Sequence, residues 1–153
     1  KQLVMEVEIN KTEKKPDLLI NYGTAGAIKT SLADIVEVGQ SVQCDMDARP
    51  LGIALGATPF ETGTERFTLS DSPLICGTAD RFVTSAPELA CDLVDMELYA
   101  LAKVANREQI PLKSFKFISD NADDSSQQDW KNSLPDSAAG FLSIQDDLLS
   151  LCG

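Results

Sequence analysis

The stretch DLLINYGTAGA at residues 17–27 contains a short apolar run that leads into a segment with two glycines. A continuous apolar run of this kind is typical of a strand buried in a parallel sheet, and the glycines indicate a turn at its end. The runs LICG at residues 74–77 and LKSFKFI at residues 112–118 repeat the arrangement, and the second of them ends in SDNAD. We therefore predict buried strands that end in polar or glycine-containing clusters.

Segments with helical spacing of apolar residues separate these strands. We predict a helix over residues 1–15 and a second helix over residues 92–109, apolar on much of its circumference and therefore largely covered. A third helical segment runs from residue 126 toward the C-terminus, and we expect breaks near Pro135 and Gly140.

Residues 36–42 predict one or two short strands, and residues 58–73, which contain prolines and a glycine, predict a long loop. Strands that alternate with helices favour an α/β layer structure, in which ligands bind beyond the carboxyl ends of the strands. Because no linker or repeat interrupts the chain, we predict a single domain over residues 1–153.

The charge balance excludes several classes of function. The 153 residues include 13 Lys and Arg against 24 Asp and Glu, which gives a formal net charge of -11. Nucleic acids and anionic membranes are recognised by clustered basic residues, so neither is an expected partner. No apolar run has the ~20 residues that a membrane helix needs, and no signal peptide opens the chain. We expect a cytoplasmic protein.

The chain contains no histidine, which excludes His-based nucleophile triads, His general bases and His-containing metal sites. Acid–base chemistry must then fall to carboxylates, Lys, Tyr or Cys. Four cysteines lie far apart without a CxxC spacing, at positions 44, 76, 91 and 152. We interpret them as small buried thiols, and we predict no metal and no cofactor.

Three clusters are candidates for a functional site: NYGTAG at residues 21–26, VDME at residues 94–97 and SDNAD at residues 119–123. Each also has an ordinary structural explanation. Glycine turns after strands are common, acidic residues favour helix N-termini, and Ser-Asp pairs cap helices.

Taken together and in this order, the clusters resemble the purine nucleoside phosphorylase family, and within it the methylthioadenosine/S-adenosylhomocysteine nucleosidases. The segments CDMD at residues 44–47 and DRFV at residues 80–83 add to the resemblance, which covers residue 15 to the C-terminus but is poor over residues 58–73. It implies a three-layer α/β fold with a mixed central sheet flanked by helices. The family has a preceding segment, with a central strand and a water-activating glutamate, for which we find no counterpart, so we expect an N-terminally short form.

The resemblance also implies roles for single residues. Asp120 matches the acid that protonates or hydrogen-bonds N7 of the departing purine, and a donor there is what cleavage of an N-glycosidic bond requires. Glu97 matches the carboxylate that binds the ribose hydroxyls, and Met96 matches the residue under the sugar.

Four further residues complete the implied site. Phe82 matches the aromatic residue that stacks on the base, and Val83 offers backbone contacts to the edge of the base. Thr24 and Gly26 match residues around the position of phosphate or the attacking water.

We therefore expect a nucleosidase that hydrolyses the N-glycosidic bond of a purine nucleoside or 5'-thio-nucleoside to free base and sugar. Phosphorolysis is the alternative, but a phosphate dianion calls for guanidinium groups, and Asn21 stands where hexameric phosphorylases of the family have an arginine. A non-catalytic, truncated nucleoside-binding protein is the other alternative. The family also pairs subunits through the region of residues 47–51, so we expect a homodimer. There Arg49 either meets a substituent of the substrate or, as we favour, forms an ion pair with Asp45 or Asp47.

Overall fold

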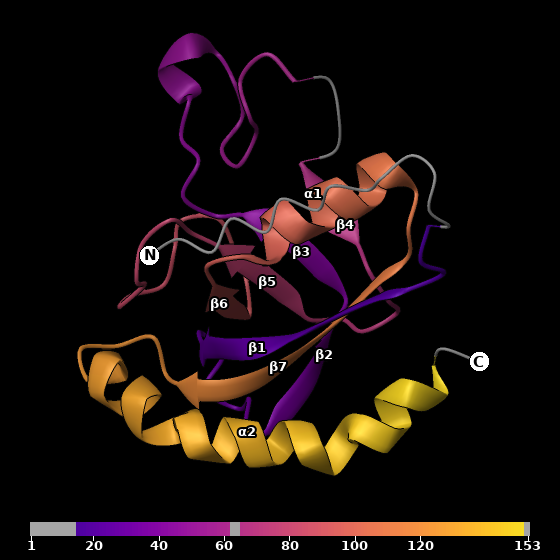
Figure 1. Ribbon diagram of the computed structural model, residues 1–153. Helices are drawn as coiled ribbons and strands as arrows, with labels where there is room; N and C mark the ends of the chain where they lie inside the picture. Colours follow the sequence, from indigo (N-terminus) through magenta and orange to yellow (C-terminus); the bar gives the residue numbers. More distant parts are fainter. Residues whose placement is uncertain (1–14, 62–64, 152–153) are drawn as a thin grey trace.

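The computed structural model describes residues 15–61 and 65–151, so the helix predicted over residues 1–15 lies almost entirely outside the described residues. The described part of the chain forms one seven-stranded sheet in the order β2-β7-β1-β6-β5-β3-β4 (Figure 1). The strands are β1 (Leu19–Ala27), β2 (Ile35–Val38), β3 (Gln40–Gln43), β4 (Arg66–Thr68), β5 (Ile75–Thr78), β6 (Leu93–Asp95) and β7 (Leu112–Asp120). The helices are α1 (Leu98–Glu108) and α2 (Ser126–Ser150), and a 3-10 turn, η1, spans Arg49–Leu51.

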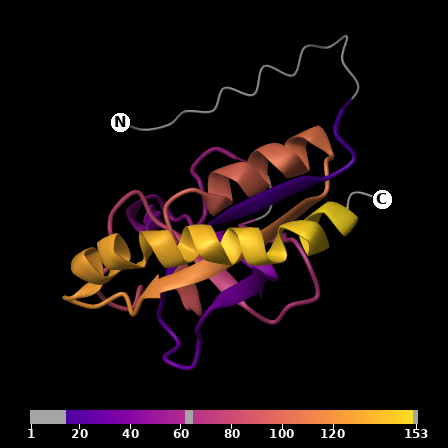
Figure 2. The same ribbon diagram turned by 60° about the horizontal axis from the view of Figure 1, so that its bottom comes forward.

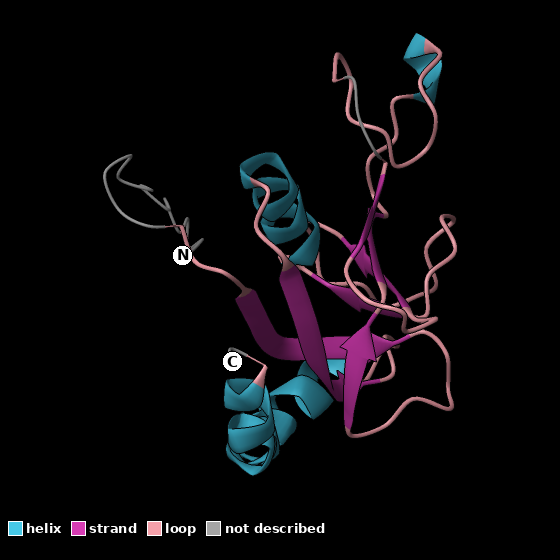
Figure 3. Cartoon of the chain, turned by 90° about the vertical axis from the view of Figure 1, so that its right-hand side faces the viewer, coloured by secondary structure: helices cyan, strands magenta, loops and turns pink. Residues whose placement is uncertain are grey.

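The sheet is mixed, and a helix covers each of its faces. β1 runs parallel to β7, and β5 runs parallel to both β3 and β6, whereas the pairs β1–β6, β2–β7 and β3–β4 are antiparallel. Figures 1 and 3 show α1 on one side of the strands and α2 on the other, and Figure 2 shows α2 lying lengthwise across its face. This arrangement confirms the predicted α/β class with a mixed sheet between helices.

Helix α1 is shorter than the sequence pattern predicts. Residues Leu93–Asp95 form strand β6 instead, because Val94 pairs with the sheet on both sides, opposite Gly26 and Gly77. The helix that follows buries a stripe of side chains against the sheet: Leu98, Tyr99, Ala102 and Ala105. Its opposite face is open, with Val104 48% exposed, so the helix is covered less completely than predicted.

Helix α2 continues through Pro135 and Gly140, where we predict breaks. A proline removes only one intrahelical hydrogen bond, and packing against the sheet outweighs that loss. At Gly140 a Cβ atom would lie 3.1 Å from both the Tyr22 hydroxyl and the Ile35 side chain, so glycine lets the helix approach the strands closely. The Tyr22 hydroxyl also donates a hydrogen bond to the Ser137 carbonyl at 2.7 Å. Tertiary contacts therefore decide the length of α2.

The predicted glycine turn at residues 22–27 is likewise wrong, because these residues extend β1 to nine residues, of which 19–26 pair with β7 and Ala27 pairs with β6. The strands predicted over residues 36–42, 74–77 and 112–118 are confirmed. The segment 58–73, predicted as loop, contains the three-residue strand β4, which pairs with β3. Among the described residues, no helix is long and apolar enough to cross a membrane.

Candidate active site

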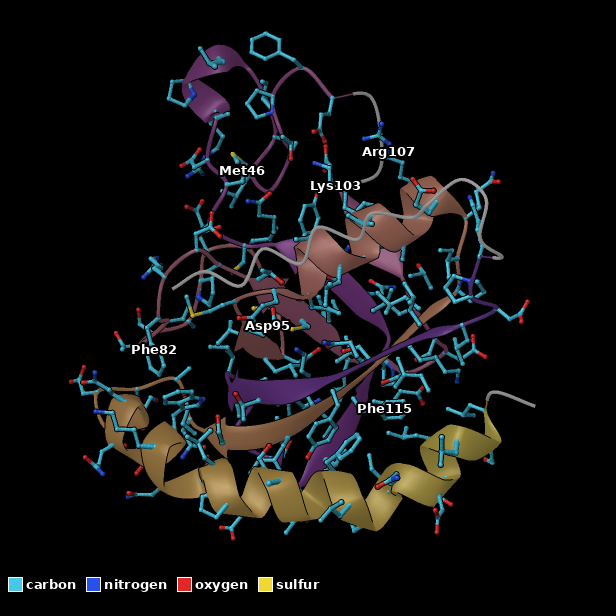
Figure 4. All side chains as sticks on the ribbon, in the orientation of Figure 1. Met46, Phe82, Asp95, Lys103, Arg107 and Phe115 are labelled. Carbon is cyan, nitrogen blue, oxygen red and sulfur yellow. The ribbon has the colours of Figure 1, made fainter. Side chains whose placement is uncertain are left out.

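A cavity of about 210 Å³ lies where β1, β6 and β7 end, and the loop after β5 and the start of α2 close its sides. All seven residues that the sequence singles out line it. The lining consists of Thr24, Ala25, Gly26, Arg81, Phe82, Val83, Val94, Asp95, Met96, Glu97, Ser119, Asp120 and Trp130. In Figure 4 the labelled Phe82 and Asp95, two of the lining residues, lie on the left of the sheet. The structure thus brings the three clusters, far apart in sequence, to one place.

Asp120 is held in place by hydrogen bonds from its own segment. It is buried, and its Oδ2 accepts a hydrogen bond from the Ser119 hydroxyl at 2.8 Å while its Oδ1 accepts one from the Ala122 amide at 2.9 Å. A shift of register between β1 and β7 at Ala25/Gly26 sets Asp120 opposite Gly26, and bulges of this kind redirect side chains. A Cβ atom on Gly26 would lie only 2.7 Å from Asp120 Oδ1. Glycine therefore leaves the space that this carboxylate occupies.

Glu97 follows the end of β6, at the N-cap position of α1. Met96, beside it, is 45% exposed at the mouth of the cavity. Partial burial and the negative charge of Asp95 raise the pKa of Glu97, and the opposing effects of Lys116 and the Met96 amide are smaller. A carboxylate in this position accepts hydrogen bonds from hydroxyl groups when it is ionised.

A buried ion pair supports this part of the site and was not predicted. Lys116 Nζ lies 2.7 Å from Asp95 Oδ2, and their side chains are 1% and 0% exposed. Asp95 also accepts hydrogen bonds from the Thr78 hydroxyl at 2.6 Å and the Leu98 amide at 2.9 Å. Burial is the largest single effect on Lys116 and acts to lower its pKa, but the charge and hydrogen bond of Asp95, together with Cys76 and Glu97, outweigh it and leave that pKa raised. The pair joins β7, β6 and the start of α1 directly beside Glu97.

The loop between β5 and β6 supplies Arg81, Phe82 and Val83. Phe82 is 41% exposed, whereas Val83 is buried. Arg81, which the sequence analysis does not single out, is the one cationic residue among the described residues of the lining. Asn21 does not line the cavity, and its side-chain oxygen accepts a hydrogen bond from the Ser114 hydroxyl at 2.9 Å. The position of Asn21 therefore bears on phosphate binding less directly than predicted.

Trp130, at the start of α2, is a further residue of the lining that sequence reasoning missed as a site residue, because its helical spacing indicates only packing. Its indole Nε1 donates a hydrogen bond to Thr24 Oγ1 at 3.0 Å.

The ion pair predicted for Arg49 is confirmed. Arg49 contacts Asp47 at 2.7 Å and Glu88 at 2.6 Å, and its guanidinium lowers the pKa of the Asp47 carboxyl to about 2. These groups lie outside the lining of the cavity. The described cysteines are free thiols: Cys44 and Cys76 are buried, as predicted, and Cys91 is half-buried.

No protein-family model matches the chain, but single proteins of known function are similar to it. A methylthioadenosine/S-adenosylhomocysteine nucleosidase of Buchnera aphidicola is 25% identical over 145 residues, which cover 78% of this chain and 62% of that protein. The chain therefore spans less than two thirds of the length of this curated relative.

Solved structures show the same fold. The nucleosidase of Helicobacter pylori superposes with a TM-score of 0.78 at 22% identity, over 88% of this chain and 68% of that one. The nucleosidase of Neisseria meningitidis, solved with methylthio-immucillin-A, gives a TM-score of 0.70 at 25% identity, over 81% and 65% of the two chains. In fold the chain is a nucleoside phosphorylase-type α/β protein, and its similarities point to the methylthioadenosine/S-adenosylhomocysteine nucleosidase branch of that superfamily.

Proposed function

We propose that the chain carries the active site of a nucleosidase that hydrolyses the N-glycosidic bond of a purine nucleoside or 5'-thio-nucleoside. The observation that carries this proposal is the meeting of Asp120 and Glu97 with an aromatic side chain, Phe82, around one cavity. The similarity to nucleosidases of this specificity supports it.

In the proposed reaction Asp120 is the general acid. Rupture of the bond between sugar and base leaves negative charge on the purine, and a proton delivered to the base relieves it. The hydrogen bonds from Ser119 and Ala122 hold the Asp120 carboxyl in one orientation and remain to stabilise its charge once the proton has left. Gly26 gives this carboxyl the room it needs.

The sugar takes the other side of the cavity in this proposal. Glu97 accepts hydrogen bonds from the ribose hydroxyls, and its negative charge favours the positive charge that builds on the ring in an oxocarbenium-like transition state. Met96 lies under the sugar, and Phe82 and Val83 contact the base. Thr24 and Gly26 border the position of the attacking water.

Phosphorolysis is the competing reaction, and Arg81 is the observation in its favour, because a guanidinium is suited to a phosphate. A single exposed arginine is weak support for a dianion that is usually held by several donors. Water is therefore the proposed acceptor, and the products are free base and free sugar.

We also propose that the chain acts as a homodimer in the cytoplasm. Residues 44–61, which follow β3, project from the body of the molecule (Figure 1). Glu61 of this segment forms an ion pair with Lys103 of α1 at 2.5 Å, and Lys103 is labelled in Figure 4. Leu51 is 68% and Phe60 99% exposed on this segment. Apolar side chains presented in this way favour contact with a second subunit.

The release of adenine from methylthioadenosine or adenosine tests the proposed activity. Asp120→Asn keeps the shape of the side chain but supplies no proton, and we expect it to lower kcat by about 10²–10⁴. Asp124→Asn is the matched control, because this exposed carboxylate lies four positions along the chain and outside the cavity. A wild-type chain that binds nucleosides but releases no base would favour the non-catalytic alternative, and an Asp120→Asn variant with more than about half of wild-type activity would refute the assigned acid.

A further inference from the structure

Two side-chain hydrogen bonds join helix α2 to strand β1. Trp130 Nε1 donates to Thr24 Oγ1 at 3.0 Å, and the Tyr22 hydroxyl donates to the Ser137 carbonyl at 2.7 Å. Tyr22 and Thr24 lie two positions apart on β1 and so face the same side of the sheet, toward α2. Only the bond between Trp130 and Thr24 lies in the lining of the cavity.

The hydrogen-bonding capacity of the two groups determines what this contact does. An indole N–H can only donate, whereas a threonine hydroxyl has one hydrogen to donate and two lone pairs that accept. Trp130 therefore occupies one lone pair of Thr24 Oγ1 and leaves the hydroxyl hydrogen unused. Within residues 15–61 and 65–151, the Thr24 hydroxyl donates to no acceptor. Its hydrogen is available to a ligand in the cavity that Thr24 lines.

We propose that Trp130 is a positioning residue, which orients the Thr24 hydroxyl so that it donates a hydrogen bond to an oxygen atom of the reacting complex. The acceptor is an oxygen of the nucleoside sugar or of the attacking water. The inference rests on the proposed function for the identity of this ligand, whereas the contact between Trp130 and Thr24 stands on the structure alone.

The variant Trp130→Phe tests the proposal, because phenylalanine keeps an aromatic ring in the wall and removes the N–H. One hydrogen bond contributes about a factor of ten, so we expect kcat/KM for methylthioadenosine to fall about tenfold. A sugar oxygen as acceptor would raise KM as well, whereas the attacking water would lower kcat alone. The control Tyr22→Phe removes the other bond between α2 and β1, outside the cavity, and leaves kcat and KM unchanged.

A double-mutant cycle separates positioning from packing. Thr24→Val removes the hydroxyl, so the N–H of Trp130 has nothing left to orient. We expect Trp130→Phe to cost about tenfold in the wild-type background and less than about twofold in the Thr24→Val background. Losses that multiply in the double variant, or a Trp130→Phe variant with wild-type kinetics, would overturn the proposal.

A spectroscopic measurement tests the contact independently of catalysis. The chain contains one tryptophan, so its ¹H–¹⁵N spectrum holds a single indole N–H signal that belongs to Trp130. In the wild-type protein we expect this proton to exchange slowly with solvent, and in Thr24→Val we expect an upfield shift and faster exchange. An indole signal that Thr24→Val leaves unchanged would overturn the inference whatever the activity. Conversely, a wild-type chain that cleaves no nucleoside but shows this dependence on Thr24 would refute only the proposed function.

Discussion

Loss of one partner of the ion pair between Lys116 and Asp95 should destabilise this fold more than loss of a partner from any other ion pair among the described residues. The substitution Lys116→Met preserves most of the volume of the side chain and removes its charge. It leaves the Asp95 carboxylate, 0% exposed, with hydrogen bonds from Thr78 and Leu98 but no counter-ion. Breaking a buried pair in this way costs about 3–5 kcal/mol, a large fraction of the ~5–15 kcal/mol that stabilises an ordinary domain.

The same strand offers a matched control. Lys113 forms an ion pair with Glu37 at 3.2 Å, and their side chains are 36% and 35% exposed. Such a pair contributes about 0–1 kcal/mol, so Lys113→Met should destabilise the protein by about 3 kcal/mol less than Lys116→Met does. In urea unfolding with a slope of about 2 kcal/mol/M, this difference separates the two midpoints by about 1.5 M.

A third variant keeps the test decisive if Lys116→Met fails to fold. Asp95→Asn combined with Lys116→Met removes both charges, so no uncompensated carboxylate remains in the core. We expect the double variant to be more stable than Lys116→Met alone. Equal unfolding midpoints for Lys116→Met and Lys113→Met would refute the reasoning, because burial of the pair would then carry no energetic consequence.

Three further outcomes follow from the site and the surface. Partial burial and Asp95 raise the pKa of Glu97, so its negative charge is lost as the pH falls through a value above the ordinary 4.5, and kcat/KM should begin to decline above pH 4.5. Glu97→Gln should lower kcat/KM and abolish this acid-side decline, and an unchanged pH profile would exclude Glu97 from the reaction. Gly26→Ala should displace Asp120 and reduce kcat about 10- to 100-fold. Gly23→Ala on the same strand should leave kcat unchanged, because its Cβ meets only Lys116 Nζ at 3.4 Å, and equal activities of the two variants would show that the space beside Asp120 is unimportant. Sedimentation should show a dimer that salt strengthens, because salt screens the repulsion of a chain with net charge -11, and a monomer at both low and high salt would contradict the assembly we propose.

The sequence predicts the strand ends and the residues that meet there, because both depend on short local patterns. The apolar runs before Gly23 and Ser119 identify two neighbouring strands, β1 and β7, and the polar residues that follow them meet at one edge. These patterns predict the edge of the sheet where the cavity lies, whereas the seven expected residues follow from the resemblance to the nucleosidase family, and all seven line the cavity.

Other features depend on contacts that no local pattern reveals. Lys116 lies in β7 between two half-buried phenylalanines, an alternation that would ordinarily indicate a solvent-facing side chain, yet it is buried because Asp95 compensates its charge. The short strand β6 follows a helical pattern in sequence and becomes a strand because the sheet offers partners on both sides. The helical spacing around Trp130 predicts an ordinary apolar helix residue, and only the packing of α2 on β1 brings its N–H to Thr24.

The identity of the acceptor tests the proposed function most directly. Methylthioadenosine should be incubated with the wild-type chain in H₂¹⁸O that contains inorganic phosphate, and the products should be analysed by mass spectrometry. Hydrolysis predicts adenine and a free methylthioribose that carries one ¹⁸O atom, with a yield that does not depend on phosphate. A sugar 1-phosphate without ¹⁸O would assign the chain to phosphorolysis, and intact substrate with no adenine would contradict a catalytic role.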